Sequence, residues 1–113
     1  MKIEKFHIYM ADLNPRFGTE PGKIRPVVVV QTNLLNDVHA STVICPMTAK
    51  VIKGSKILRV HLTKRQSGLD RESDILVDQI RAVDNRRLVK HIGKLTLPDQ
   101  RRLLGNLRIV ILE

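Results

Sequence analysis

The sequence predicts a small, mainly β fold, an antiparallel barrel that one C-terminal helix covers at one side. Short apolar segments recur along the chain with turn residues between them, a pattern typical of small all-β barrels. Only the last segment shows the apolar period of a helix. The 113 residues correspond to a single domain spanning 1–113, which can bury a modest core without metals or disulfides.

The expected strands differ in how they are buried. In Phe6–Asp12, apolar residues at every second position predict a strand that is buried on one face. Val27–Val30 is an unbroken β-branched run, which is typical of a strand buried on both faces. We expect further strands at Ser41–Met47, Ile57–Leu62, Ser73–Ala82 and His91–Leu95, and a turn at Gln66–Asp70.

Two helices are expected near the C-terminus. Asp84–Leu88 predicts a short helix with Asp84 as its N-cap. A longer helix is expected to begin after the N-cap Thr96, with Pro98 in its first turn and Asp99 three residues after the cap. Its apolar residues fall at helical spacing and predict one stripe, formed by Leu103, Leu104, Leu107, Val110 and Ile111.

The charge balance favours an anionic partner. Lysine and arginine outnumber aspartate and glutamate by 20 to 11, so the formal net charge is +9. A balance of this size most simply indicates nucleic acid, with an acidic protein partner or plain solubility as alternatives. The few aromatic residues, Phe6, Tyr9 and Phe17, do not supply a broad platform for base stacking.

Several other classes of protein are disfavoured. Cys45 lies in an apolar segment and is the only cysteine, so we interpret it as a core thiol in a reducing cytoplasm. Met1–Lys5 is not followed by a signal-peptide apolar region, and no apolar run approaches the ~20 residues of a membrane helix. We expect no metal and no other cofactor, because the histidines have no ligand spacing: His7, His39, His61 and His91. His7 is expected to be a solvent-facing strand residue.

The stretch Leu13–Asn33 joins an irregular loop to a buried strand. Its first half contains the chain breakers Pro15, Gly18, Pro21 and Gly22. These exclude regular helix or strand there. Pro26 favours extended geometry at Arg25, which is therefore expected where the loop becomes the strand. Binding and catalytic groups often occupy such loops, although a surface loop with a merely solvated Arg25 remains the alternative.

The same stretch resembles a known family. Residues 18–30 read G-T-E-P-G-K-I-R-P-V-V-V-V and resemble the signature of the MazF/PemK/Kid toxin endoribonucleases, roughly G-[ST]-E-Q-x-G-x-R-P-V. Pro21 stands where that family often has glutamine, and the matching residues are Gly18, Thr19, Glu20, Gly22, Arg25 and Pro26. Val43–Thr48 resembles the family strand that ends in a P-x-T-like triplet, and Ile75–Arg81 resembles its D-Q-[IV]-[KR] string. The resemblance covers almost the whole chain.

The chain also departs from the family pattern. Phe6 and His7 occupy positions where the family usually has glycine followed by aspartate or glutamate. Leu76 stands where some members have a catalytic arginine, and Thr19 stands where others have a contributing histidine. These departures favour a MazF-like site over a Kid-like acid/base assignment.

The resemblance implies that Arg25 and Thr48 are the main catalytic residues. Both side chains would contact the same phosphate. The planar guanidinium of Arg25 would donate hydrogen bonds to the phosphate oxygens, on which negative charge builds when the RNA's own 2′-OH attacks. Such a preorganised donor contributes roughly 3–4 kcal/mol. Thr48 would bind the same phosphate or position the attacking hydroxyl.

Two carboxylates are candidates for the general base. Glu20 is either the base or, with slight preference, the residue that orients Arg25 through an ion pair. Asp78 is the other candidate base, and a strand carboxylate paired with a neighbouring arginine is an equally good interpretation. The resemblance and the basic loops place RNA contacts at Phe17, Thr19, Lys50, Asp78 and Gln79.

Fold and function follow together from the resemblance. It implies an SH3-like barrel of the MazF/Kid/CcdB type that forms a homodimer, the cytoplasmic toxin of a type II toxin–antitoxin pair. Activity would be sequence-specific, metal-independent cleavage of single-stranded mRNA, which leaves a 2′,3′-cyclic phosphate and a 5′-OH. The antitoxin would carry an acidic, partly disordered segment, and operator DNA would be bound only through the toxin–antitoxin complex. The alternatives are a CcdB-like gyrase poison without nuclease activity and a catalytically inactive nucleic-acid-binding module.

Overall fold

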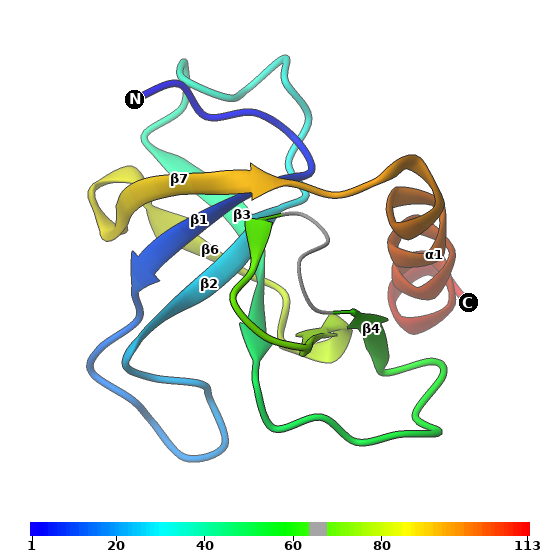
Figure 1. Cartoon of the computed structure of the whole chain (residues 1–113). Coiled ribbons are helices and arrows are strands. Elements are labelled where there is room, and N and C mark those ends of the chain that lie inside the picture. Colours follow the sequence, from blue (N-terminus) through cyan, green and yellow to red (C-terminus); the bar gives the residue numbers. More distant parts are fainter. Residues whose placement is uncertain (64–67) are drawn as a thin grey trace.

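An antiparallel sheet and one C-terminal helix form the chain in the computed structural model (Figure 1), which confirms the mainly β class. The structure describes residues 1–63 and 68–113, so the predicted turn at Gln66–Asp70 lies partly outside the described residues. The strands are β1 (His7–Asp12), β2 (Ile24–Val29), β3 (Ser41–Thr48), β4 (Arg59–Leu62), β5 (Ser73–Leu76), β6 (Arg81–Asp84) and β7 (Leu88–Lys94). The helix α1 (Leu97–Leu107) continues into a π-helical turn at Arg108–Leu112, and 3-10 turns lie at Val77–Gln79 and Asn85–Arg87.

The sheet is open where the sequence predicted a closed barrel. The strand order is β4-β5-β3-β2-β1-β7, with β6 paired to β3, and within residues 1–63 and 68–113 no pairing joins β4 to β7. The core explains how the open side is filled. Leu62 of β4, Leu95 after β7 and Leu103 of α1 belong to one buried cluster, so the helix packs between the two end strands.

The predicted strand Ser73–Ala82 is wrong in one respect, because it is divided into β5 and β6. The two halves pair with opposite ends of β3: Met47 faces Ile75, whereas Ser41 faces Asp84. A straight strand cannot reach both ends, and the turn at Val77–Gln79 supplies the bend. The predicted short helix is the 3-10 turn that follows, and its cap is confirmed, since Asp84 accepts a hydrogen bond from the Arg86 amide at 2.9 Å. The last strand begins at residue 88, earlier than the predicted residue 91.

The C-terminal helix begins as predicted, but its apolar stripe is narrower. The Thr96 hydroxyl accepts a hydrogen bond from the Asp99 amide at 3.4 Å. Leu103 is fully buried, and Leu107 and Val110 pack against the same cluster. Leu104 and Ile111 were predicted in this stripe and are instead 44% and 51% exposed. Each lies one residue, about 100° of rotation, beyond the row that faces the core.

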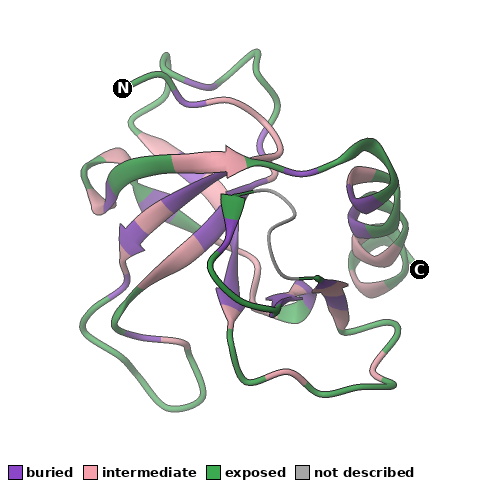
Figure 2. Cartoon of the chain, in the orientation of Figure 1, coloured by how far each residue is buried: buried purple, intermediate pink, exposed green. Residues whose placement is uncertain are grey.

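The centre of the sheet is buried on both faces (Figure 2). Val28 belongs to the cluster beneath α1, whereas Val27 and Val29 belong to a second cluster on the other face, which confirms the prediction for this run. Cys45 is a free thiol with no exposed surface. Burial, with a smaller effect from the Asp78 carboxylate, raises the pKa of Cys45 to about 12. The interpretation of Cys45 as a core thiol is therefore confirmed.

The start of β1 is unusual. Phe6 has φ 68°, a left-handed conformation that favours glycine, at the position where the resembled family has glycine. His7 is less exposed than predicted: only 22% of its side chain is accessible. Its Nδ1 lies 2.9 Å from Nε2 of His91 on β7, and its Nε2 lies 3.5 Å from the Glu4 carboxylate. Burial lowers the pKa of His7 from its ordinary value.

Candidate functional site

A cleft of about 420 Å³ opens where β2 and β3 meet the segment 68–73. In the ladder between these strands Val27 faces Pro46, and continuing that register to the strand ends places Arg25 opposite Thr48. Both residues line the cleft. The structure therefore brings together the two residues that the sequence analysis placed on one phosphate. Lys50, predicted to bind RNA, lines the same cleft.

Backbone carbonyls hold the guanidinium of Arg25 in place. Its Nε donates to the Gly22 carbonyl at 2.8 Å, and its Nη1 donates to the Met47 carbonyl at 3.2 Å. Among the described residues, Nη2 has no hydrogen-bond partner. Partial burial, with a smaller effect from Arg16, lowers the pKa of Arg25 from its usual value. An arginine nevertheless stays charged at neutral pH, so the cleft contains a fixed cation with donor capacity to spare.

Gly22 explains part of this geometry. A Cβ atom at this position would lie 2.6 Å from Cβ of Arg16, closer than any ordinary contact. The loop between β1 and β2 can therefore fold back on itself only with glycine here. Because the Gly22 carbonyl is an acceptor for Arg25, this close approach also fixes the arginine.

Thr48 ends β3 with its side chain half-buried. Its Oγ1 accepts a hydrogen bond from the Lys50 amide at 3.1 Å, which leaves the hydroxyl hydrogen available for donation. Arg71 adds another cation to the cleft lining, and Asp70 is the carboxylate there. The cleft is thus basic and contains a hydroxyl donor beside a fixed guanidinium.

A neighbouring hollow gathers other predicted RNA contacts. Thr19, Asp78 and Gln79 line a depression of about 330 Å³, together with Leu76 and Arg59. No ion pair among the described residues joins Asp78 to an arginine, so the alternative interpretation of that carboxylate is not seen in the structure. Four of the five predicted RNA contacts therefore line a depression, Lys50 in the cleft and the other three in this hollow.

Glu20 and Phe17 are exposed on the loop between β1 and β2, and neither lines the cleft or the hollow. Thr19 and Pro21, on either side of Glu20, do line the hollow. The Glu20 amide donates to the Phe17 carbonyl at 3.0 Å, and the Phe17 residue is 68% exposed. Within the described part of the chain no ion pair joins Glu20 to Arg25. The expected orienting ion pair is not seen there, and two backbone carbonyls hold the guanidinium instead.

The sequence analysis missed a buried carboxylate beside Thr48. Asp74 faces Thr48 across the β3–β5 ladder and is 1% exposed. Its Oδ2 accepts from the Ile52 amide and from Nη1 of Arg59, each at 3.0 Å, and its Oδ1 lies 3.0 Å from Nδ1 of His61. Burial raises the pKa of Asp74, but these hydrogen bonds outweigh it and hold the pKa below its usual value.

This carboxylate anchors the segment that follows Thr48. Nη1 of Arg59 also donates to the Lys50 carbonyl at 2.8 Å, so both ends of Lys50–Ile52 are tied to one network. The available signal in the sequence was the alternation of 57–62, which puts Arg59 and His61 on one face of a strand, and the carboxylate of Asp74 beside the apolar residues Ile75–Val77.

Within residues 1–63 and 68–113, no three histidine, cysteine, aspartate or glutamate side chains are placed to hold a metal ion. No helix in that part of the chain is long and apolar enough to span a membrane.

The fold and the cleft define a small antiparallel β protein whose basic site suits a phosphodiester. The chain belongs to the family of PemK-like, MazF-like toxins of type II toxin–antitoxin systems, whose model matches residues 4–111. The predicted family is thereby confirmed.

Individual relatives agree with this assignment. Endoribonuclease EndoA of Bacillus subtilis (strain 168) is 34% identical over 95 residues, which cover 84% of this chain and 82% of that protein. The crystal structure of MazF (Form-I) from Deinococcus radiodurans matches with a TM-score of 0.85 at 23% identity, over 100% of this chain and 99% of that one. An endoribonuclease in complex with its cognate antitoxin, from a mycobacterial species, matches with a TM-score of 0.73 at 16% identity, over 96% and 92% of the two chains. These two structures support the fold.

Proposed function

We propose that this toxin is a sequence-specific, metal-independent endoribonuclease that cuts single-stranded mRNA in the cytoplasm. The observation that carries the proposal is the Arg25 guanidinium, which two carbonyls fix beside Thr48 in a basic cleft. The similarity to Endoribonuclease EndoA supports the same activity.

In the proposed mechanism, the scissile phosphate binds between Arg25 and Thr48. The 2′-oxygen attacks phosphorus, and the bond from phosphorus to the 5′-oxygen breaks. Arg25 stabilises the charge that develops on the non-bridging oxygens, an effect worth about 3–4 kcal/mol for a single preorganised donor. The 5′-oxygen leaves with the bonding electrons and takes a proton from water, so the products are a 2′,3′-cyclic phosphate and a 5′-OH.

The proton of the 2′-OH needs an acceptor. We assign this role to Glu20, because the loop that carries it supplies the Gly22 carbonyl to Arg25 and its neighbours Thr19 and Pro21 line the hollow. Among the described residues, no ion pair occupies its carboxylate. Asp78 and Gln79 would then contact a base in the neighbouring hollow with Thr19. Exposed Phe17 would stack on a base, and Lys50 would contact a phosphate.

The proposed assembly is a homodimer that an antitoxin inhibits. Apolar side chains that α1 and the following turn leave exposed support a second copy as partner; they are Leu104, Ile109, Ile111 and Leu112. The net charge of +9 supports an antitoxin with an acidic, partly disordered segment. Operator DNA would be bound only through the toxin–antitoxin complex.

The decisive experiment is cleavage of a long RNA in EDTA. We expect discrete cuts with cyclic phosphate ends for the wild type, and a loss of about 100- to 1,000-fold in rate for Arg25→Ala. Thr48→Ala should also be impaired, and Thr48→Ser should recover part of the rate. Arg86→Ala is the matched control, because the Arg86 side chain is 91% exposed and pairs only with Asp84 among the described residues.

Failure of the well-folded wild type to cut RNA would refute the nuclease. The CcdB-like gyrase poison is not favoured, because the chain belongs to the MazF-like family. Unchanged cleavage in Arg25→Ala would retain the nuclease but exclude the proposed site.

A further inference from the structure

Another cleft is lined in part by the segment that follows Thr48. It has a volume of about 570 Å³ and opens between the segment 52–56, β4 and α1. It shares Ile52, Ser55 and Arg59 with the hollow that contains Asp78 and Gln79, and shares no lining residue with the Arg25–Thr48 cleft. The second cleft is therefore contiguous with the hollow, and its lining begins two residues after Lys50, which lines the Arg25–Thr48 cleft.

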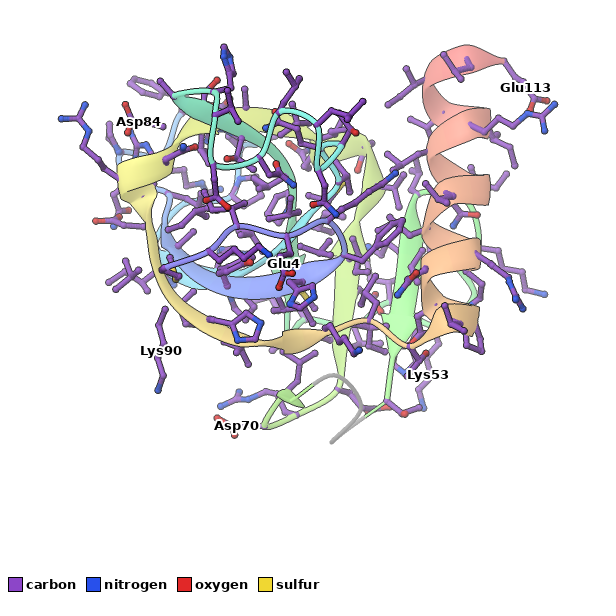
Figure 3. All side chains as sticks on the ribbon, turned by 90° about the horizontal axis from the view of Figure 1, so that it is seen from above. Glu4, Lys53, Asp70, Asp84, Lys90 and Glu113 are labelled. Atoms are coloured by element: carbon purple, nitrogen blue, oxygen red, sulfur yellow. The ribbon has the colours of Figure 1, made fainter. Side chains whose placement is uncertain are left out.

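Cations dominate the lining of this cleft. Lys53, Lys56, Arg59 and Arg102 line it, and Glu72 is the carboxylate in the lining. Neither lysine forms an ion pair with a described residue, and both are exposed. Figure 3 shows Lys53 near α1, on the side of the molecule away from Lys90.

Each of the two arginines forms an ion pair with a buried carboxylate. Arg59 pairs with Asp74, and Arg102 pairs with Asp99, whose side chain is 5% exposed. These pairs neutralise much of the arginine charge but fix the guanidinium groups at the wall of the cleft. The uncompensated charge is therefore that of Lys53 and Lys56.

The two lysines stand on either side of a turn that is tied to α1. Gly54 between them has φ 90°, which glycine adopts without strain. Nδ2 of Asn106 donates to the Lys56 carbonyl at 2.9 Å. The segment is thus anchored at the helix while its lysine side chains remain exposed.

We propose that this second cleft binds the backbone phosphates of the RNA strand beyond the cleaved position. The inference rests on the proposed ribonuclease function and extends its substrate contacts. Lysine, arginine, serine and asparagine side chains can donate hydrogen bonds to phosphate oxygens, and such contacts do not depend on the RNA sequence. An amphipathic acidic peptide would need a groove with several apolar anchors, and the apolar residues that line this cleft are Ile52 and Val60. The lining therefore favours the nucleic-acid backbone.

The test compares a short RNA that spans only the cut site with the same RNA extended on both sides. The variant is the double substitution Lys53→Gln with Lys56→Gln. The matched control is Lys90→Gln with Lys94→Gln, which removes the same charge from exposed positions on β7. Cleavage kinetics and fluorescence anisotropy are measured for both RNAs over a range of salt concentrations.

We expect the cleft variant to raise KM for the extended RNA by about tenfold and to leave kcat unchanged. The slope of log Kd against log salt should fall by about 1.4, because each lost phosphate contact on a single strand accounts for about 0.7. The short RNA should show no difference, and the control variant should behave like the wild type with both RNAs.

Three results would overturn the inference. An equal loss in the control variant would show a general effect of net charge. An equal loss with the short and extended RNAs would place the lysines at the cleaved phosphate. A loss of affinity for a poly-glutamate probe, with RNA unaffected, would assign the cleft to an acidic protein. A wild type that binds both RNAs and cleaves neither would instead refute the proposed function.

Discussion

Replacing Asp74 with asparagine tests the network beside Thr48. The carboxylate accepts hydrogen bonds from Ile52 and Arg59, and lies at hydrogen-bond distance from His61. An amide group has the same size but turns an NH₂ toward at least one of these donors. The Arg59 side chain, 18% exposed, also loses its counter-charge. Removing one partner of a buried pair costs about 3–5 kcal/mol, and we expect the lower end because Arg59 keeps some contact with water.

The assay is urea and thermal unfolding at one fixed protein concentration. For a domain of this size, a loss of about 3 kcal/mol lowers Tm by about 12 °C. Asp70→Asn is the control, because Asp70 is exposed and has no described hydrogen bond or ion pair. Its Tm should match that of the wild type.

The effect of Asp74→Asn should also depend on pH. The folded-state pKa of Asp74 lies below its ordinary value, so the carboxylate contributes stability above its unfolded pKa of about 3.9. That contribution is lost as the pH falls through the folded pKa. The difference in unfolding free energy between wild type and variant should therefore be full at neutral pH and shrink as the pH falls below about 3.9, the unfolded pKa. A loss below about 1 kcal/mol at neutral pH, or a difference that does not shrink in acid, would refute the network.

Three further predictions concern separate parts of the chain. Gly22→Ala should lower RNA cleavage by about tenfold, because the added Cβ displaces an acceptor of Arg25, whereas Gly105→Ala meets no atom within 4 Å and should leave cleavage unchanged. Cys45 should react with a thiol reagent only as fast as the protein unfolds, since burial raises its pKa to about 12; rapid labelling of native protein would contradict this. Leu104→Ser combined with Ile111→Ser should shift the sedimentation equilibrium toward monomer with an unchanged circular dichroism spectrum, because both residues are exposed; an unchanged association constant would place the dimer interface elsewhere.

Local patterns predicted those features that depend on neighbours in sequence. The valine run correctly predicted a strand that is buried on both faces, and Thr96 correctly predicted the start of α1. Both features depend on residues that are close in sequence. Within the helix the sequence pattern predicted too many buried residues, because periodicity alone does not determine how wide an apolar stripe the core covers. Leu104 lies just outside that stripe.

The features that sequence reasoning missed depend on sheet order. Asp74 meets Ile52 and Arg59 across 22 and 15 residues, and only the pairing of β5 with β3 and β4 brings them together. The expected ion pair between Glu20 and Arg25 failed for a related reason. Proximity in sequence suggested it, but the acceptors that Arg25 contacts are the Gly22 and Met47 carbonyls, and the Met47 carbonyl comes from another strand.

The position of Asp74 along the chain has a consequence for synthesis on the ribosome. Arg25 and Thr48 are translated first, but the carboxylate that anchors the residues after Thr48 belongs to β5, and α1 follows only at Leu97–Leu107. A nascent chain that ends before β5 contains both of the proposed catalytic residues without the strand whose carboxylate anchors the residues after Thr48. We therefore expect the cleft to assemble only near the end of translation, so that a growing toxin leaves the message that encodes it intact.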